Sequence, residues 1–165
     1  MLRIVKAHRT WPIDIALRHA QRIREAMEPV CGKVEVCGSI RRQKDWVSDI
    51  DIICTTKEKS EKVWESFDRF MDNVDASGRC MLRGKMKAGI RIQVAIVEEE
   101  GWGAALCHAT GGQETNIVMR TRAIAMGTKL NQYGIWQGSR RVAGLTEREV
   151  FETLNMEWKE PQERG

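Results

Sequence analysis

Two aspartates, Asp49 and Asp51, stand two positions apart at the start of an apolar run. Residues 47–54 have the composition of a buried β-strand, so both carboxylates point to the same face of a sheet. Two carboxylates on one edge supply hard oxygen ligands, which suit a divalent ion such as Mg²⁺, with Mn²⁺ as its substitute. A chain with this pattern must form a sheet that brings the pair to an open edge, and we predict a metal site there.

A Gly-Ser turn and two arginines shortly precede the aspartates in the stretch GSIRRQKDWVSDID. Gly38 and Ser39 can offer backbone N–H groups and a hydroxyl to phosphate oxygens. Arg42 can add charge-assisted phosphate contacts, while Arg41 is expected to pair with a carboxylate nearby. A phosphate cradle beside a metal site is typical of nucleotidyl transfer. The alternative, that the two aspartates are capping or surface carboxylates, is disfavoured by this upstream motif.

The composition fits a soluble globular chain with an anionic partner. With 165 residues, the chain can form one domain or two small subdomains around a buried core. Hydrophobic residues make up 42% and charged residues 30%, which is ordinary for a soluble protein. The net charge of +4 is concentrated in short basic clusters, which suit a polyanion. These clusters lie within residues 41–44, 83–91, 120–122 and 140–141.

The cysteines and the N-terminus exclude several classes of protein. Five cysteines form no CxxC pair and have no histidine at zinc-site spacing, so we expect buried free thiols in a reducing compartment, with one disulfide as the alternative. The N-terminal sequence MLRIVKAHR has no long apolar segment, and no apolar run approaches membrane-spanning length. We therefore expect a soluble cytoplasmic or otherwise intracellular protein with no membrane partner.

Apolar periodicity predicts both helices and strands. Helices are expected over residues 12–30, 61–71, 113–126 and 146–154, and strands over 33–37, 47–54, 89–97 and 129–136. Residues 73–88 are expected to form a loop or hairpin, and residues 101–109 a small-residue helix or turn. Within 89–97, strict alternation places Arg91, Gln93 and Ala95 on the face opposite the isoleucines.

With these motifs in place, the chain resembles the family X DNA polymerases, the group that contains DNA polymerase beta. GSIRR followed by SDIDII resembles the palm motif of that family. Residues 109–136, ATGGQETNIVMRTRAIAMGTKLNQYGIW, resemble its nucleotide-selecting C-terminal subdomain, and residues 142–165 resemble its closing segment. The likeness is greatest to the small viral members, which consist of these two parts without lyase or helix-hairpin-helix modules.

The resemblance implies an α+β fold. A nucleotidyltransferase palm, a mixed sheet with helices on one face, is expected over residues 1–107, and a small α/β nucleotide-selection subdomain over residues 108–165. The implied activity is template-directed addition of dNMP to a DNA 3′ end, with gap filling in DNA repair as the expected setting. The implied mechanism uses two Mg²⁺ ions, and the implied partners are gapped or primer-template DNA and a dNTP. A monomer is expected.

Site residues follow from the resemblance position by position. Asp49 and Asp51 match the two carboxylates that hold both metal ions. Gly38, Ser39 and Arg42 match the triphosphate-binding turn, with Ser48 beside it. The positions expected beneath and beside the sugar and base of the nucleotide are His108, Gly111 and Asn116. The positions expected to contact DNA are Lys85, Lys87, Arg91, Arg120 and Tyr133, of which Arg120 and Tyr133 match residues that face the template strand.

Two departures from the family pattern affect activity. The family has a third aspartate on the next strand, and an ungapped count from Thr110 places it at Gln93, whereas the local pattern with a shortened loop places it at Ala95. We expect Ala95, and in either placement the carboxylate is missing, through natural loss or a constructed Asp→Ala change. The second departure is Ala109, which stands where the family has an aromatic ring below the sugar, and which predicts weak exclusion of ribonucleotides.

Two other functions remain open from the sequence alone. One is a small-molecule nucleotidyltransferase, which shares the GS…DxD core but gives no reason for the motif in residues 109–136. The other is a non-catalytic module that binds DNA or nucleotide after loss of the third carboxylate.

Overall fold

The computed structural model describes residues 9–165. Residues 1–8 lie outside the described part. The prediction that the N-terminal segment MLRIVKAHR is not a secretory signal therefore falls almost entirely outside the described residues. Within residues 9–165, no helix is both long enough and apolar enough to cross a membrane. All five cysteines belong to the described part and are free thiols, as predicted; four are buried, whereas Cys80 is exposed.

The first lobe is built on a five-stranded sheet of order β2-β4-β7-β6-β5. Its strands are β2 (Cys31–Val36), β4 (Asp49–Thr56), β5 (Met71–Ser77), β6 (Met81–Met86) and β7 (Arg91–Ile96). β4 and β7 run parallel, whereas the other neighbouring strands are antiparallel. The predicted mixed sheet is therefore confirmed. Residues 73–88, expected as a loop or hairpin, contribute to the β5–β6 hairpin and the turn that follows it.

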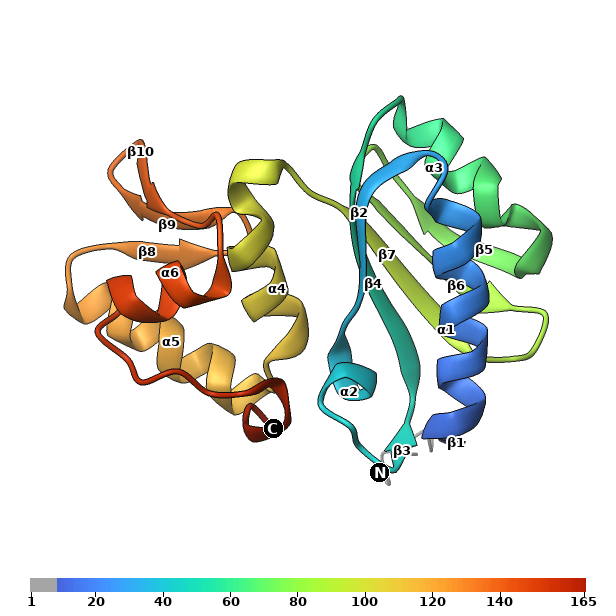
Figure 1. The fold of residues 1–165 in the computed structure, drawn as a ribbon, viewed down its shortest axis with the longest axis horizontal. Helices are drawn as coiled ribbons and strands as arrows, with labels where there is room; N and C mark the ends of the chain where they lie inside the picture. Colours follow the sequence, from blue (N-terminus) through green and yellow to red (C-terminus); the bar gives the residue numbers. More distant parts are fainter. Residues whose placement is uncertain (1–8) are drawn as a thin grey trace, which may run out of the picture.

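Two helices cover one face of this sheet (Figure 1), namely α1 (Ile13–Met27) and α3 (Ser60–Phe67). α1 presents an apolar stripe to the sheet, made of Ala16, Ala20, Ile23 and Met27. Ile50 and Ile52 of β4 pack into the same core. Because side chains alternate along a strand, Asp49 and Asp51 lie on the opposite face, which these helices do not cover.

Short elements complete the first lobe: β1 (Trp11–Pro12), α2 (Gly38–Arg41), β3 (Trp46–Val47) and the 3₁₀ helix η1 (Asp68–Phe70). β1 and β3 pair in an antiparallel manner. The helix expected over residues 61–71 is shorter than predicted. It tightens into η1 after Phe67, and the buried Met71 already begins β5.

The second lobe combines three α-helices with an antiparallel sheet of order β10-β9-β8. Its elements are η2 (Glu99–Gly101), α4 (Trp102–Thr110), α5 (Gln113–Ala125), β8 (Lys129–Asn131), β9 (Gly134–Gln137), β10 (Arg140–Ala143), α6 (Glu147–Thr153) and η3 (Pro161–Glu163). Their buried side chains form a separate core that includes Met119, Ile135 and Phe151. Figure 1 shows this lobe facing the side of the first sheet that α1 and α3 leave open.

The single strand expected over residues 129–136 is wrong, because the chain reverses within it. β8 and β9 form a hairpin in which Asn131 pairs with Gly134. The side-chain oxygen of Asn131 accepts a hydrogen bond from the backbone N–H of Tyr133 (2.9 Å), which closes the turn. Gly134 follows with φ of +146°, a backbone conformation that favours glycine. β10 extends this sheet and has no counterpart among the predicted strands.

α4 lies between the lobes and packs on both of them. Ala104 and Cys107 belong to the core of the second lobe, whereas Ala105 and Leu106 pack against Ile53 of β4. The division that we expected between residues 107 and 108 therefore falls inside this helix. Side chains that point from α4 toward β4 thus reach the open face of the first sheet.

Candidate active site

The predicted carboxylate pair lies on the open face of the first sheet. Asp49 and Asp51 begin β4, and both side chains are partly buried in a cavity of about 400 Å³ between the lobes. Burial, and then the negative charge of Asp49, raise the pKa of Asp51 to about 6, against the opposing effect of Arg42 and Arg83. Two carboxylates held this close repel each other, and a cation between them would relieve that repulsion.

The Gly-Ser turn lies against the same carboxylates. Gly38 has φ of +60°, and a Cβ built on it would collide with the carboxylate of Asp51. The backbone N–H of Cys37 donates to the carbonyl of Asp51 (2.7 Å), which ties the turn to β4. Gly38, Ser39 and Ser48 line the cavity together with the two aspartates. Both the backbone conformation and the space around it therefore favour glycine at position 38.

The two arginines after this turn have different roles. Arg42 lines the cavity and donates to the backbone carbonyl of Thr110 (2.8 Å), so its guanidinium lies where the lobes meet. Arg41 makes a paired contact with Glu147 of α6 (2.9 and 2.8 Å), and a longer one with Glu35 of β2 (3.8 Å). Its carboxylate partners thus come from both lobes, and one of them, Glu147, is distant in the sequence.

The neighbouring strand does not supply a third carboxylate. In the parallel register of β4 and β7, Gln93 lies beside Asp51, whereas Ala95 lies beside Ile53, two residues further along. Both positions line the cavity. The register therefore favours Gln93 over Ala95 as the position equivalent to a third ligand of Asp51. Within residues 9–165, no three His, Cys, Asp or Glu side chains form a group that could hold a metal ion.

Arg83 is a site residue that the sequence interpretation missed. It pairs with Gln93 in the β6–β7 register, and its Nε donates to Oε1 of Gln93 (2.7 Å). Asp51, Gln93 and Arg83 thus form one row across three strands, on the open face. Strict alternation along β6, with buried residues at 82, 84 and 86, was the sequence signal that could have found Arg83.

The second lobe closes the cavity with the residues expected around the nucleotide. His108, Ala109 and Gly111 line it from α4 and the turn that follows. The side-chain amide of Asn116 donates to the carbonyls of His108 (2.9 Å) and Gly111 (3.2 Å), so it is held over this turn. The pKa of His108 is lowered, first by burial of the imidazole and then by the charge of Arg120. The neutral imidazole is thus favoured at neutral pH.

The expected DNA contacts separate into two groups. Lys85 and Arg91 pair across β6 and β7, in the row that contains Asp49, so they lie on the open face. Arg120 is exposed on α5, and its Nε donates to the backbone carbonyl of Asn116 (3.2 Å). Tyr133 lines a different hollow near the connection of the lobes, and Lys87 lies in the turn after β6. None of these five residues lines the cavity around Asp49 and Asp51.

A carboxylate pair and a glycine turn on the open face of a mixed sheet define a nucleotidyltransferase-like class of fold. A family model described as DNA polymerase beta thumb matches residues 105–165. The chain is similar to the DNA polymerase/3′-5′ exonuclease PolX of Bacillus subtilis, with 30% identity over 131 residues that cover 76% of this chain and 23% of that protein. It is also similar to DNA polymerase lambda of Rattus norvegicus, with 25% identity over 160 residues that cover 78% of this chain and 28% of that protein.

Solved structures of a DNA polymerase beta have a fold similar to that of this chain. A Leishmania infantum polymerase beta in a ternary gap complex superposes with a TM-score of 0.85 at 21% identity, over 94% of this chain and 71% of that chain. The same protein in a ternary P/T complex gives a TM-score of 0.83 at 22% identity, over 95% and 77% of the two chains. The chain is a relative of the family X DNA polymerases, and it spans about a quarter of the length of PolX and DNA polymerase lambda.

Proposed function

We propose that this chain transfers a nucleoside monophosphate from a dNTP to a DNA 3′ end under the direction of a template. Gap filling in DNA repair is the proposed setting, and the chain acts there as a soluble intracellular monomer. The observation that carries the proposal is the cavity between the lobes. In it, Asp49 and Asp51 face the glycine turn at Gly38 and the nucleotide-side turn at Gly111. The relatives are named DNA polymerases, and one is described in a gap complex.

The triphosphate would bind beside the turn at Gly38. Backbone N–H groups there, the Ser39 hydroxyl and the Arg42 guanidinium provide donors for phosphate oxygens. The sugar would lie against Ala109 and Gly111, and Asn116 would approach the base. Positioning and charge neutralisation of this kind supply most of the acceleration in phosphoryl transfer.

The donor set fits one divalent ion. Asp49 and Asp51 are hard oxygen ligands on one face of the sheet. Because Asp51 is buried beside the like charge of Asp49, a bound cation would stabilise the ionised form of the pair. Such an ion supplies neutralisation of the triphosphate and of the leaving pyrophosphate when bound. We assign it to Asp49 and Asp51, with Mg²⁺ as the natural ion and Mn²⁺ as its substitute.

The donor set does not fit a second ion, which the family resemblance implied. The neighbour of Asp51 is the neutral amide of Gln93, and that amide is hydrogen-bonded to the positively charged Arg83. A guanidinium on the row repels another cation. The residues present would therefore hold one ion rather than two.

The absence of a carboxylate beside Asp51 on β7 favours a second candidate function, a module that binds DNA and nucleotide without transferring the nucleotide. Without a third carboxylate, the primer hydroxyl lacks a protein base beside Asp51, and such a base contributes about 10²–10⁴-fold. The two candidates share the cavity and its ligands, and they differ only in whether the primer is extended.

Primer extension on gapped duplex DNA with Mg²⁺ or Mn²⁺ tests the proposal. We expect extension by the chain as it stands, and a loss of at least about a hundredfold in Asp49→Asn and Asp51→Asn, because a bound ion supplies several kcal/mol of charge stabilisation. Asp45→Asn is the matched control, since Asp45 is exposed and outside the cavity. Its rate should not change.

Two results would overturn polymerase activity. If no extension occurs but dNTP binding depends on Asp49 and Asp51, the non-catalytic module is the better assignment. If neither extension nor dNTP binding depends on them, the cavity is not the nucleotide site.

A further inference from the structure

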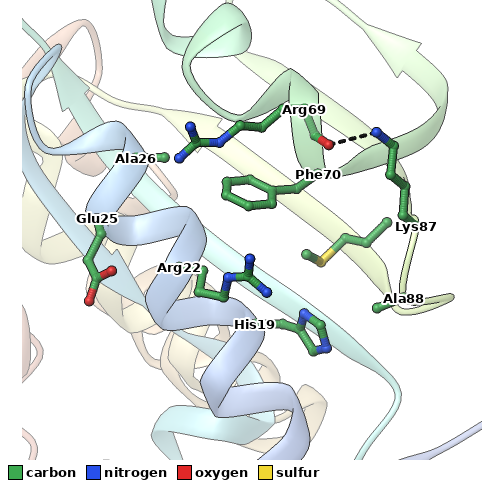
Figure 2. Close-up of a pocket in the computed structure, with 9 residues that line it drawn as sticks. His19, Arg22, Glu25, Ala26, Arg69, Phe70, Lys87 and Ala88 are labelled. Carbon is green, nitrogen blue, oxygen red and sulfur yellow. Dashed lines mark hydrogen bonds between the residues drawn. The ribbon is translucent and has the colours of Figure 1, made fainter.

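A second hollow lies on the helix-covered side of the first sheet, away from Asp49 and Asp51. Its volume is about 580 Å³, and it opens between α1, η1 and the turn that joins β6 to β7. Met86, which is buried in the core of the first lobe, forms part of its base. We call it the back pocket. Its polar lining comes from His19, Arg22, Glu25, Arg69 and Lys87 (Figure 2).

Three cations of the back pocket are held by contacts that leave their charge unpaired. The guanidinium carbons of Arg22 and Arg69 lie 5.3 and 4.7 Å from the centroid of the Phe70 ring. The ammonium of Lys87 donates to the backbone carbonyl of Arg69 (2.8 Å), a contact drawn in Figure 2. A half-buried ring that interacts with two guanidinium groups limits their rotamers and keeps them at the pocket.

No carboxylate neutralises this group. Within residues 9–165, no Asp or Glu oxygen lies within 4 Å of the charged nitrogens of Arg22, Arg69 or Lys87. Residues 1–8 contain neither Asp nor Glu. Glu25, the acidic residue of the lining, accepts a hydrogen bond from Gln21 instead. Like charges around one hollow raise the local positive potential.

His19 lines the back pocket beside these positive charges. Its pKa is lowered, first by burial and then by the positive charges of Arg22 and Arg18. The imidazole lines the back pocket beside Arg22 in Figure 2 and adds a neutral donor or acceptor to the lining.

We propose that the back pocket binds phosphate groups. The planar guanidinium groups of Arg22 and Arg69 can each engage phosphate oxygens through two N–H groups, and Lys87 adds a point charge. The phosphate comes either from a nucleic-acid backbone or from a free compound such as pyrophosphate. The two sources share this chemistry, and binding here is independent of nucleotidyl transfer at Asp49 and Asp51.

The test compares two double variants of equal charge. The first, Arg22→Gln/Lys87→Gln, removes two cations of the back pocket and is called the pocket pair. The second, Lys59→Gln/Lys62→Gln, removes two exposed cations at the start of α3, outside the pocket, and is called the control pair. Thermal unfolding of both proteins confirms that they fold. If the pocket pair does not fold, Arg22→Gln alone, which breaks no hydrogen bond or ion pair of the described residues, is compared with Lys59→Gln.

The first arm follows backbone amide NMR shifts of Phe70 and Lys87 during titration with inorganic phosphate and pyrophosphate, with chloride at matched ionic strength as the reference. The second arm measures the affinity for duplex DNA by fluorescence anisotropy at several KCl concentrations. If backbone phosphates occupy the pocket, the pocket pair lowers the slope of log K against log [salt] by about two, since each lost contact removes about 0.9. The control pair leaves the slope unchanged.

Each outcome decides the proposal. Saturable shifts with pyrophosphate that the pocket pair abolishes support a free phosphate compound as the source. A specific loss of DNA affinity and salt slope in the pocket pair supports the nucleic-acid backbone. The proposal is overturned if both arms are flat, or if the two pairs of substitutions have equal effects, because net charge alone would then explain the result.

Discussion

At the scale of single residues, the row of Asp51, Gln93 and Arg83 sets the metal capacity of the site. An amide is a weaker ligand for a hard cation than a carboxylate, and a guanidinium on the same row opposes a second ion electrostatically. Neither effect can be predicted from the aspartate motif itself. Both effects follow from the register of β4, β7 and β6, which places the three side chains next to one another.

This row predicts the number of bound ions. With a non-hydrolysable dNTP analogue, we expect the natural chain to bind one Mn²⁺ and Gln93→Asp/Arg83→Met to bind two, because the double change adds a ligand and removes the repelling charge. Calorimetric titration measures this stoichiometry without requiring activity. Ala95→Asp/Arg83→Met is the matched control. Two ions in the natural chain would contradict the expectation, and two ions only in the control would assign the third position to Ala95.

Gly38 gives a second prediction at this scale. Gly38→Ala should destabilise the fold and weaken Mn²⁺ binding, because its Cβ would displace the carboxylate of Asp51. Gly138→Ala is the control, since Gly138 has nearly the same φ (+59°) and open space around it. The control should cost about 1 kcal/mol of unfolding free energy, the conformational part alone. Chemical denaturation compares the two, and an equal cost with intact Mn²⁺ binding would show that the turn accommodates the methyl group.

At the scale of elements, α6 depends on its N-terminal cap. The hydroxyl of Thr146 accepts a hydrogen bond from the backbone N–H of Glu149 (3.1 Å), and the Glu149 carboxylate accepts from Gly144 and Leu145. The first contact satisfies an N–H group that the first turn of a helix leaves without a partner, and the other two tie the residues before Thr146 to the helix. Since α6 carries Glu147, the cap also fixes the carboxylate that joins the lobes.

Thr146→Ala should therefore lower the unfolding free energy by about 1 kcal/mol. Thr121→Ala is the control, because Thr121 is exposed in the interior of α5. There alanine should be neutral or slightly stabilising, as its helix propensity is higher. Denaturant unfolding at pH 7 measures both, and equal effects would mean that the cap contributes nothing.

Local patterns predicted most elements, but they could not predict where chain reversals fall inside a run. Alternation identified β7, and helical spacing identified α1 and α5 to within a few residues. The run over residues 129–136 is predicted as one strand because apolar and aromatic residues recur along it, at Leu130, Tyr133, Ile135 and Trp136. At the reversal, the side-chain oxygen of Asn131 accepts hydrogen bonds from the backbone N–H of Tyr133 and from the indole N–H of Trp136. The position of the missing carboxylate, at Gln93 or at Ala95, likewise depends on the pairing of β4 with β7, which lies outside any local pattern.

At the scale of the whole molecule, a buried cluster of charges joins the two lobes. Glu147 accepts hydrogen bonds from Arg41 of the first lobe and from Arg164 near the C-terminus (2.5 Å). The Arg164 guanidinium also lies over the rings of Phe151 and Trp158, at 5.1 and 4.8 Å. Arg41 and Glu147 are 106 positions apart, so no sequence spacing could pair them. The site between the lobes depends on this cluster, because Arg41 belongs to the same turn as Gly38.

Glu147→Gln should cost about 3 kcal/mol of unfolding free energy at pH 7, because it leaves the buried Arg164 without a counter-charge and leaves Arg41 with only its longer contact to Glu35 (3.8 Å). Burial raises the pKa of Glu147, but the hydrogen bonds from Arg41 and Arg164 outweigh it and hold this pKa below its usual value of 4.5. A carboxyl with a lowered folded-state pKa contributes stability that is complete above its unfolded-state pKa and is lost as the pH falls through the folded-state value.

The difference between the natural chain and Glu147→Gln should thus be full at pH 7 and begin to shrink below about pH 4.5. Denaturant unfolding across pH 3–7 measures it. Glu152→Gln, an exposed position on the same helix, is the control and should have little effect at any pH. A Glu147→Gln cost that stayed constant down to pH 3 would show that shape, rather than charge, makes Glu147 the link between the lobes.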